Sequence, residues 1–227
     1  MADEGKEAIL ALPDELHIAE KKFRYCEHAQ TTYEMNFCAA YDAEVAAQWR
    51  QDELEKLSSR WPRADRAAFA ALQQAEEAFV LAHGCGETYL GGTISGLRVN
   101  GVEERQRDNF VAAVRKFESG NLPRGTEADY KKADVDLNTT YRAALHFAAK
   151  QNFDEDYGCI QPDGIQKAER AWLKYRDAWV AFAKLHDPQT NSSAWLTLIT
   201  RNRYWSLRMT MCAVGWKDRA CKTHEAE

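Results

Sequence analysis

Apolar residues recur at helical spacing along most of the chain. Between residues 62 and 83, Phe69, Leu72, Ala75, Phe79 and Val80 fall on one face, which predicts an amphipathic helix with that face toward the core. Only five prolines and long stretches rich in Ala, Glu, Lys, Arg and Leu also favour helix over sheet. The pattern predicts helices over residues 6–24 (interrupted or restarted near 13–14), 31–57, 62–83, 102–117, 126–151, 164–185 and 192–214. The fold class predicted is therefore all-α.

Residues at the expected helix ends support these ranges. Thr31 followed by Glu34 forms the pattern of a capping box, so a helix should begin there, and Pro62 suits the first position of the next helix. Ser192 or Ser193 should cap the last helix. Within the helix that follows Thr31, one face carries Phe37, Tyr41, Val45 and Gln48/Trp49.

Cys26 and Cys38 lie on the two sides of this predicted helix start. One continuous helix would separate their sulfurs by about 18 Å, at roughly 1.5 Å per residue, which is too far for a bond. A chain reversal before Thr31 would bring them together and allow a disulfide that holds the preceding loop against the helix. The alternative is a pair of unlinked cysteines.

Three segments resemble the LprI-type lysozyme-inhibitor family of secreted bacterial proteins. They are TTYEMNFCAA at 31–40, ADVDLNTTY at 133–141 and ERAWLKYRDA at 169–178, with a weaker tail at 198–203 followed by Leu207. The family pattern is usually one compact unit, whereas here the first two segments lie about ninety residues apart. Glu169 stands where the family tends to carry Gln, and Trp179 where it often carries Cys.

An internal repeat would explain that separation. Residues 75–80 align with 168–173, residues 105–107 with 201–203, and residues 43–45 with 133–135, in the same order. We interpret them as two diverged three-helix units at 26–118 and 126–214, packed as one helical domain or as two small ones. An N-terminal helical extension (1–25) precedes them and a tail (215–227) follows; residues 120–125 form the linker. Chance similarity among helices rich in Ala and Glu is the alternative.

A glycine-rich stretch at 84–96 is expected to be the longest irregular segment. It follows no predicted strand and carries no Lys-Ser/Thr, so a phosphate loop is not indicated. It is either a permissive helix connection in which glycine supplies positive φ, or a protruding loop that enters the cleft of a partner. On the second interpretation the partner-binding residues are Glu87, Thr88, Tyr89, Leu90, Thr93 and Ser95.

Composition and cysteine usage narrow the function classes. A formal net charge of -5 makes nucleic acid an unsuitable partner, and no run of apolar residues approaches a membrane span. The six cysteines show no C-x-x-C spacing, so we expect no metal and two or three disulfides: Cys26–Cys38 first, and Cys212–Cys221 second. The start at Met1 lacks the signal-peptide pattern, but the resemblance implies export, so we expect a periplasmic or secreted protein whose leader is absent.

Candidate catalytic groups are weak. Glu76, Glu77 and Glu169 could serve as acid/base carboxylates, but such residues more often pair with arginine or with a helix end. Trp172, Tyr175 and Trp179 can share one helix face, either as a core stripe or as part of a ligand site. No histidine has a local motif around it, so no Ser-His-Asp or Cys-His arrangement is indicated, and we expect neither an enzyme nor a cofactor.

The resemblance implies a non-catalytic protein that inhibits a peptidoglycan-cleaving enzyme by occluding its cleft, as a lysozyme inhibitor or as an immunity protein against a cell-wall toxin. An acidic chain suits a basic enzyme of this kind. The alternative is an envelope-associated interaction module that shares only the fold.

Overall fold

The computed structural model describes residues 25–90, 92–150, 160–216 and 221. This part of the chain forms a short 3-10 helix, η1 (Tyr25–His28), and six α-helices. The α-helices are α3 (Thr32–Ser58), α4 (Arg63–Gly86), α5 (Ser95–Glu118), α6 (Glu127–Lys150), α7 (Pro162–His186) and α8 (Ser192–Ala213). The predicted all-α class is confirmed. The helix expected at 6–24 lies outside the described residues.

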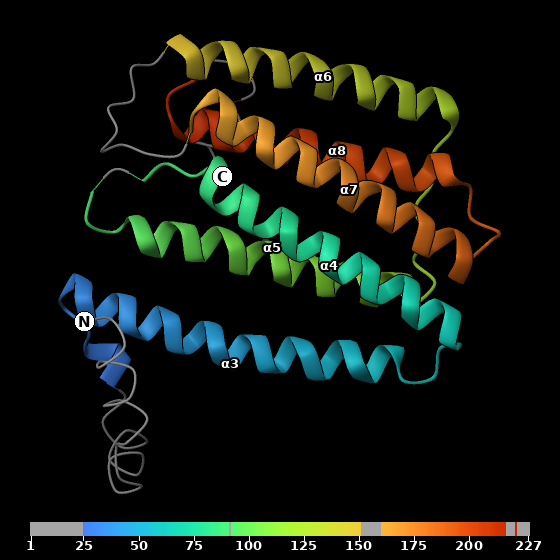
Figure 1. The fold of residues 1–227 in the computed structure, drawn as a ribbon, viewed down its shortest axis with the longest axis horizontal. Helices are drawn as coiled ribbons and strands as arrows, with labels where there is room; N and C mark the ends of the chain where they lie inside the picture. Colours follow the sequence, from blue (N-terminus) through green and yellow to red (C-terminus); the bar gives the residue numbers. More distant parts are fainter. Residues whose placement is uncertain (1–24, 91, 151–159, 217–220, 222–227) are drawn as a thin grey trace, which may run out of the picture.

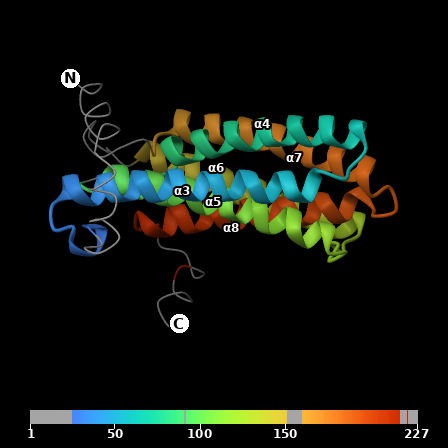
Figure 2. The ribbon, with the colours of Figure 1, turned by 90° about the horizontal axis from the view of Figure 1, so that it is seen from below.

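The helices form a bundle with α4 and α7 at its centre (Figure 1). These two helices make the most extensive contact in the described structure; α3 packs on α5, and α6 packs on α8. Seen from below, α4 and α7 lie on one side of the bundle and α5 and α8 on the other (Figure 2). The first helix of each predicted unit therefore packs on its third helix, and the two middle helices join the units.

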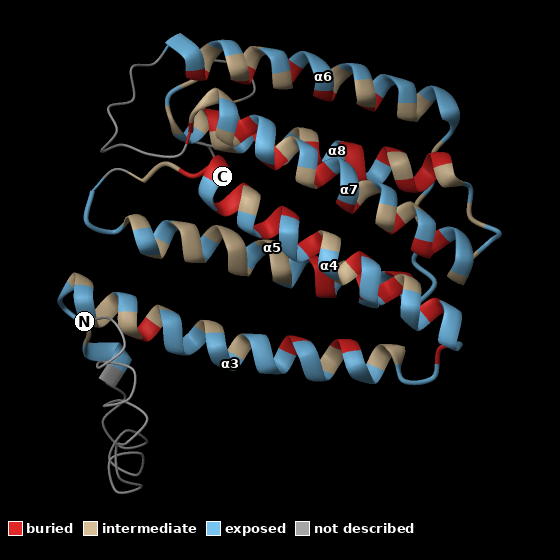
Figure 3. Ribbon diagram, in the orientation of Figure 1, coloured by how far each residue is buried: buried red, intermediate tan, exposed pale blue. Residues whose placement is uncertain are grey.

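One hydrophobic core runs through both predicted units. Buried positions lie mainly on the facing sides of the helices (Figure 3). The predicted α4 face is confirmed, with Phe69 and Phe79 each 3% exposed. On α7, Trp172, Tyr175 and Trp179 are all buried, which confirms the core stripe. Because these side chains belong to one cluster, the two units share a core.

The apolar face of α3 lies outward. Tyr41, Val45 and Trp49 are 46%, 55% and 48% exposed. The inner side of this edge helix instead carries Arg50, which donates hydrogen bonds to Glu104 at 2.6 Å and to Asp108 at 2.8 Å on α5. Sequence periodicity placed these apolar residues correctly on one face of α3. Periodicity alone does not show whether another helix covers that face.

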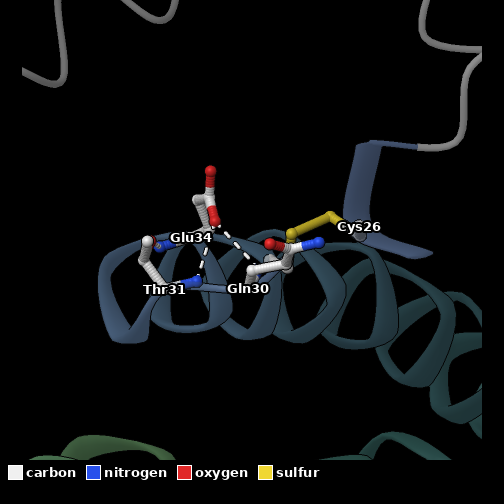
Figure 4. Close-up of a disulfide and its surroundings, with 5 residues drawn as sticks. Cys26, Gln30, Thr31 and Glu34 are labelled. Carbon is white, nitrogen blue, oxygen red and sulfur yellow. Dashed lines mark hydrogen bonds between the residues drawn. A yellow bond between two sulfur atoms is a disulfide. The ribbon is translucent and has the colours of Figure 1, made fainter. Parts of the chain in front are cut away.

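The start of α3 is built as the sequence predicts (Figure 4). The backbone N–H of Glu34 donates to Thr31 Oγ1 at 3.2 Å, and Glu34 Oε2 accepts from the N–H groups of Gln30 and Thr31, at 2.9 and 2.8 Å. The chain reverses before this cap, so the Cα atoms of Cys26 and Cys38 are 5.6 Å apart and their sulfurs are bonded.

The carboxy-terminal end also contains the expected disulfide. Cys212 and Cys221 are bonded, with their Cα atoms 5.5 Å apart, while Cys159 lies outside the described residues. The cap predicted for α8 is wrong by one or two residues. Asn191 is the cap, and its side-chain oxygen accepts from the backbone N–H of Ser193. Ser193 is buried and its hydroxyl donates to Glu127 at 2.8 Å instead.

The glycine-rich stretch is shorter than expected. Helix α4 continues through Gly86 and α5 already begins at Ser95, so the connection covers residues 87–94 only. Gly86 is the last residue of α4, and α7 passes so close to it that a Cβ there would come within 2.6 Å of the backbone oxygen of Gly164. Among the described glycines of the stretch, Gly92 has a positive φ, of 86°. Close helix packing, which sequence does not show, explains the difference.

Candidate functional site

The connection between α4 and α5 has a buried base and an exposed tip. Among the predicted partner-binding residues, Glu87 is 1% and Thr88 7% exposed. Tyr89, Leu90 and Ser95 are partly exposed, and Thr93 is exposed. The fold therefore leaves the far part of this loop accessible, while its first two residues are occupied inside the bundle. The role of all six residues in binding a partner stays a prediction.

Glu87 is held by a buried ion cluster that joins the two units. Arg203 on α8 donates to Glu87 Oε2 at 2.7 Å through Nη1, and its Nη2 bonds Glu87 Oε1. The Nε of Arg203 donates to Glu169 on α7 at 2.9 Å, and His83 Nδ1 lies 2.7 Å from Glu87 Oε2. The side chains of Arg203 and Glu87 are fully buried. A charged pair in this position fixes the base of the loop to the second unit.

The electrostatics of this cluster depend on Arg203. Burial acts to raise the pKa of Glu87, but the Arg203 guanidinium and His83 together hold it at about 2. Burial raises the pKa of Glu169, and Arg203 offsets part of this rise. Glu87 is thus a permanent anion at neutral pH, with its oxygens already occupied. The cluster is suited to structure rather than to proton transfer.

The two other candidate carboxylates, Glu76 and Glu77, also differ from each other in whether an arginine pairs with them. Burial, and then the nearby charge of Glu77, raise the pKa of Glu76 to about 8. Glu76 Oε1 has no hydrogen-bond partner among the described residues. Glu77 instead accepts from Arg107 on α5 at 2.8 and 3.1 Å. Arginine pairing thus accounts for Glu77 and Glu169, and Glu76 stands apart as a neutral buried acid.

A groove of about 1530 Å³ runs between α5 and α8, and sequence reasoning missed it. Its floor includes aromatic side chains of α4 and α7, among them Phe79, Tyr175 and Trp179. Its cationic side chains are Arg98, Arg105, Lys116, Arg124, Arg201 and Arg203, and the single carboxylate among its described lining residues is Glu87. A sequence signal existed in the helical spacing of Leu198, Trp205 and Met209, but it requires knowing that α5 and α8 are neighbours.

Two further properties hold for the described part of the chain. No helix there is long and apolar enough to cross a membrane. The same residues contain no group of three or more His, Cys, Asp or Glu side chains placed to bind a metal ion.

The fold defines a disulfide-bonded helical protein, and comparison with known families makes this more specific. Residues 123–207 match the family described as Lysozyme inhibitor LprI, which confirms the resemblance drawn from the sequence. The matched segment covers α6, α7 and most of α8. Members of this inhibitor family are generally non-catalytic.

A second comparison found an uncharacterized protein of Rhizobium meliloti (strain 1021). It is 40% identical over 57 residues, which are 22% of this chain and 40% of that protein. The chain thus spans about 40% of the length of that relative. No solved structure matches.

Proposed function

We propose that this protein binds a peptidoglycan-cleaving enzyme of the lysozyme type and blocks its cleft without chemistry of its own. The observation that carries this proposal is the match of residues 123–207 to the lysozyme-inhibitor family. Two disulfides support action outside the cytoplasm, in the periplasm or after secretion, because such bonds persist in oxidising compartments. Protection of a bacterium against a delivered cell-wall toxin is the form of this function that we favour.

The loop at 87–94 is the element that we propose enters the enzyme. Its base is fixed through Glu87 and Arg203, and its tip carries the exposed Thr93 and Ile94, the latter 37% exposed. A loop with a rigid base loses less conformational entropy on binding than a free one. The overall negative charge would speed association with a basic enzyme.

Inhibition of a panel of purified peptidoglycan hydrolases by the oxidised protein tests the function. The panel should include animal-type lysozyme and lytic enzymes of competing bacteria. We expect stoichiometric inhibition of at least one of them. Inhibition of none would contradict the proposal and favour a non-catalytic interaction module of the cell envelope.

The loop assignment has its own test once an inhibited enzyme is known. Thr93→Arg places a bulky charge on the exposed tip and should weaken inhibition by about tenfold or more. Gln51→Arg, at an exposed position on α3 outside the matched segment, is the control and should change inhibition little. Equal inhibition by both variants would remove the loop from the interface while leaving the function standing.

A further inference from the structure

The groove between α5 and α8 is larger than an ordinary small-molecule site. Its volume is about 1530 Å³, whereas pockets for small ligands are usually roughly 300–1,000 Å³. An α-helix with side chains is about 10–12 Å wide and rises roughly 1.5 Å per residue, so this volume corresponds to about three helical turns. The groove therefore has the size of a short helical segment.

The charge of the groove is mainly positive although the whole chain is acidic, and its one carboxylate among the described lining residues, Glu87, is paired with Arg203. Arg105, Lys116 and Arg124 line it and are exposed, and no ion pair joins any of them to another described residue. Arg107, by contrast, lies on α5 with Arg105 and Lys116 but is paired with Glu77. Uncompensated cations along a hollow concentrate a field that attracts carboxylates. An occupant of this groove should therefore be anionic.

The opposite wall, on α8, presents three large apolar side chains among its polar ones. Leu198, Trp205 and Met209 on α8 are 39%, 49% and 45% exposed and all line the groove. Their spacing of seven and then four residues places them on one side of the helix. A row of exposed Leu, Trp and Met beside a row of cations matches a ligand that has an apolar face and an acidic face.

We propose that this groove binds an acidic amphipathic α-helix of a partner protein. The apolar face of that helix would lie against Trp205 and its neighbours, and its carboxylates would reach Arg105, Lys116 and Arg124. Recognition of an amphipathic helix in an apolar groove is a recurrent mode of protein binding. A second copy of the groove itself would be repelled by its own charges. This inference is independent of the proposed inhibition.

Binding of designed peptides to the full chain tests the proposal. The probe is a fluorescein-labelled peptide of about 18 residues with apolar side chains at every third and fourth position and glutamate elsewhere. One control replaces glutamate by lysine, and another scrambles the order to destroy the apolar face. Fluorescence anisotropy should give a dissociation constant at least about tenfold smaller for the probe than for either control.

Variants of the protein identify the site. Arg105→Glu/Lys116→Glu and, separately, Trp205→Ala should each weaken binding of the acidic probe by about tenfold or more. The matched control Arg66→Glu/Lys174→Glu makes the same charge change at exposed positions outside the groove and should stay within about twofold. Thermal unfolding followed by circular dichroism shows whether each variant is folded. If the charge variant is unfolded, binding of the probe to Trp205→Ala tests the site instead.

Several outcomes would overturn the proposal. They are absence of probe binding at about 1 mM, equal affinity for the scrambled peptide, or unchanged affinity in both groove variants. Displacement of the probe by soluble peptidoglycan fragments that bind more tightly would assign the groove to a glycan instead.

Discussion

Two buried glutamates of this protein lie in opposite electrostatic environments. Glu87 is ionised because Arg203 and His83 bind its oxygens, whereas Glu76 has a pKa of about 8 and an oxygen without a partner among the described residues. Sequence singled out Glu76 and Glu77 together, yet only the fold shows which one Arg107 reaches.

Glu76→Gln should make the protein more stable in a pH-dependent way. The folded-state pKa of Glu76 lies above its unfolded value, so its contribution to stability is intact below about pH 4.5 and declines as pH rises toward about 8. The free energy of unfolding of the variant should equal that of the wild type near pH 4 and exceed it by about 2–4 kcal/mol at pH 8. Urea unfolding at pH 4, 6 and 8 measures this, and a difference independent of pH would contradict it.

Arg203→Met should destabilise the fold by about 3–5 kcal/mol, because it leaves Glu87 and Glu169 without their cation. Adding Glu87→Gln and Glu169→Gln should recover part of the loss. The control is Arg107→Met, whose ion pairs are more exposed and should contribute about 1 kcal/mol or less. Equal losses for Arg203→Met and Arg107→Met in urea unfolding would show that burial does not decide the strength of these pairs.

At the scale of elements, periodicity and capping residues predicted which segments are helices well, but they predicted poorly which glycines lie inside a helix. The helix at Thr32–Ser58 begins and ends within one residue of expectation, and the predicted capping box marks its start. The helix α5 begins at Ser95, well before the predicted start near residue 102, because Gly96 and Gly101 both lie within the helix. Glycine is compatible with a helix wherever packing stabilises it, and packing between distant segments is absent from local sequence.

Two glycine substitutions should therefore have opposite effects. Gly86→Ala places a Cβ at 2.6 Å from the backbone oxygen of Gly164, so α4 and α7 must separate and stability should fall by about 1–3 kcal/mol. Gly101→Ala, in α5, meets no atom within 4 Å and should raise stability by about 0.5–1 kcal/mol. Thermal unfolding of both variants checks this. An unchanged melting temperature for Gly86→Ala would show that the two helices can move apart freely.

At the scale of the molecule, sequence predicted two three-helix units but not how they fit together. The duplication stays a prediction; the matching order of packing, α3 on α5 and α6 on α8, is what it would produce. The loop could be proposed from its glycines, whereas the groove could not, because its walls come from residues about a hundred positions apart. Pairing of helices depends on the whole core, to which all six helices contribute.

A shared core implies that the two units unfold together. Leu72 on α4 and Leu207 on α8 are both fully buried, and either change to Ala should cost about 2–5 kcal/mol. If the core is one cooperative unit, Leu72→Ala lowers the hydrogen-exchange protection of slowly exchanging amides in α8 as much as in α4. Leu207→Ala should likewise lower the protection of such amides in α4 as much as in α8. Loss of protection confined to the substituted unit would instead mean two small domains that unfold separately, with α4 and α7 meeting across an interface between them.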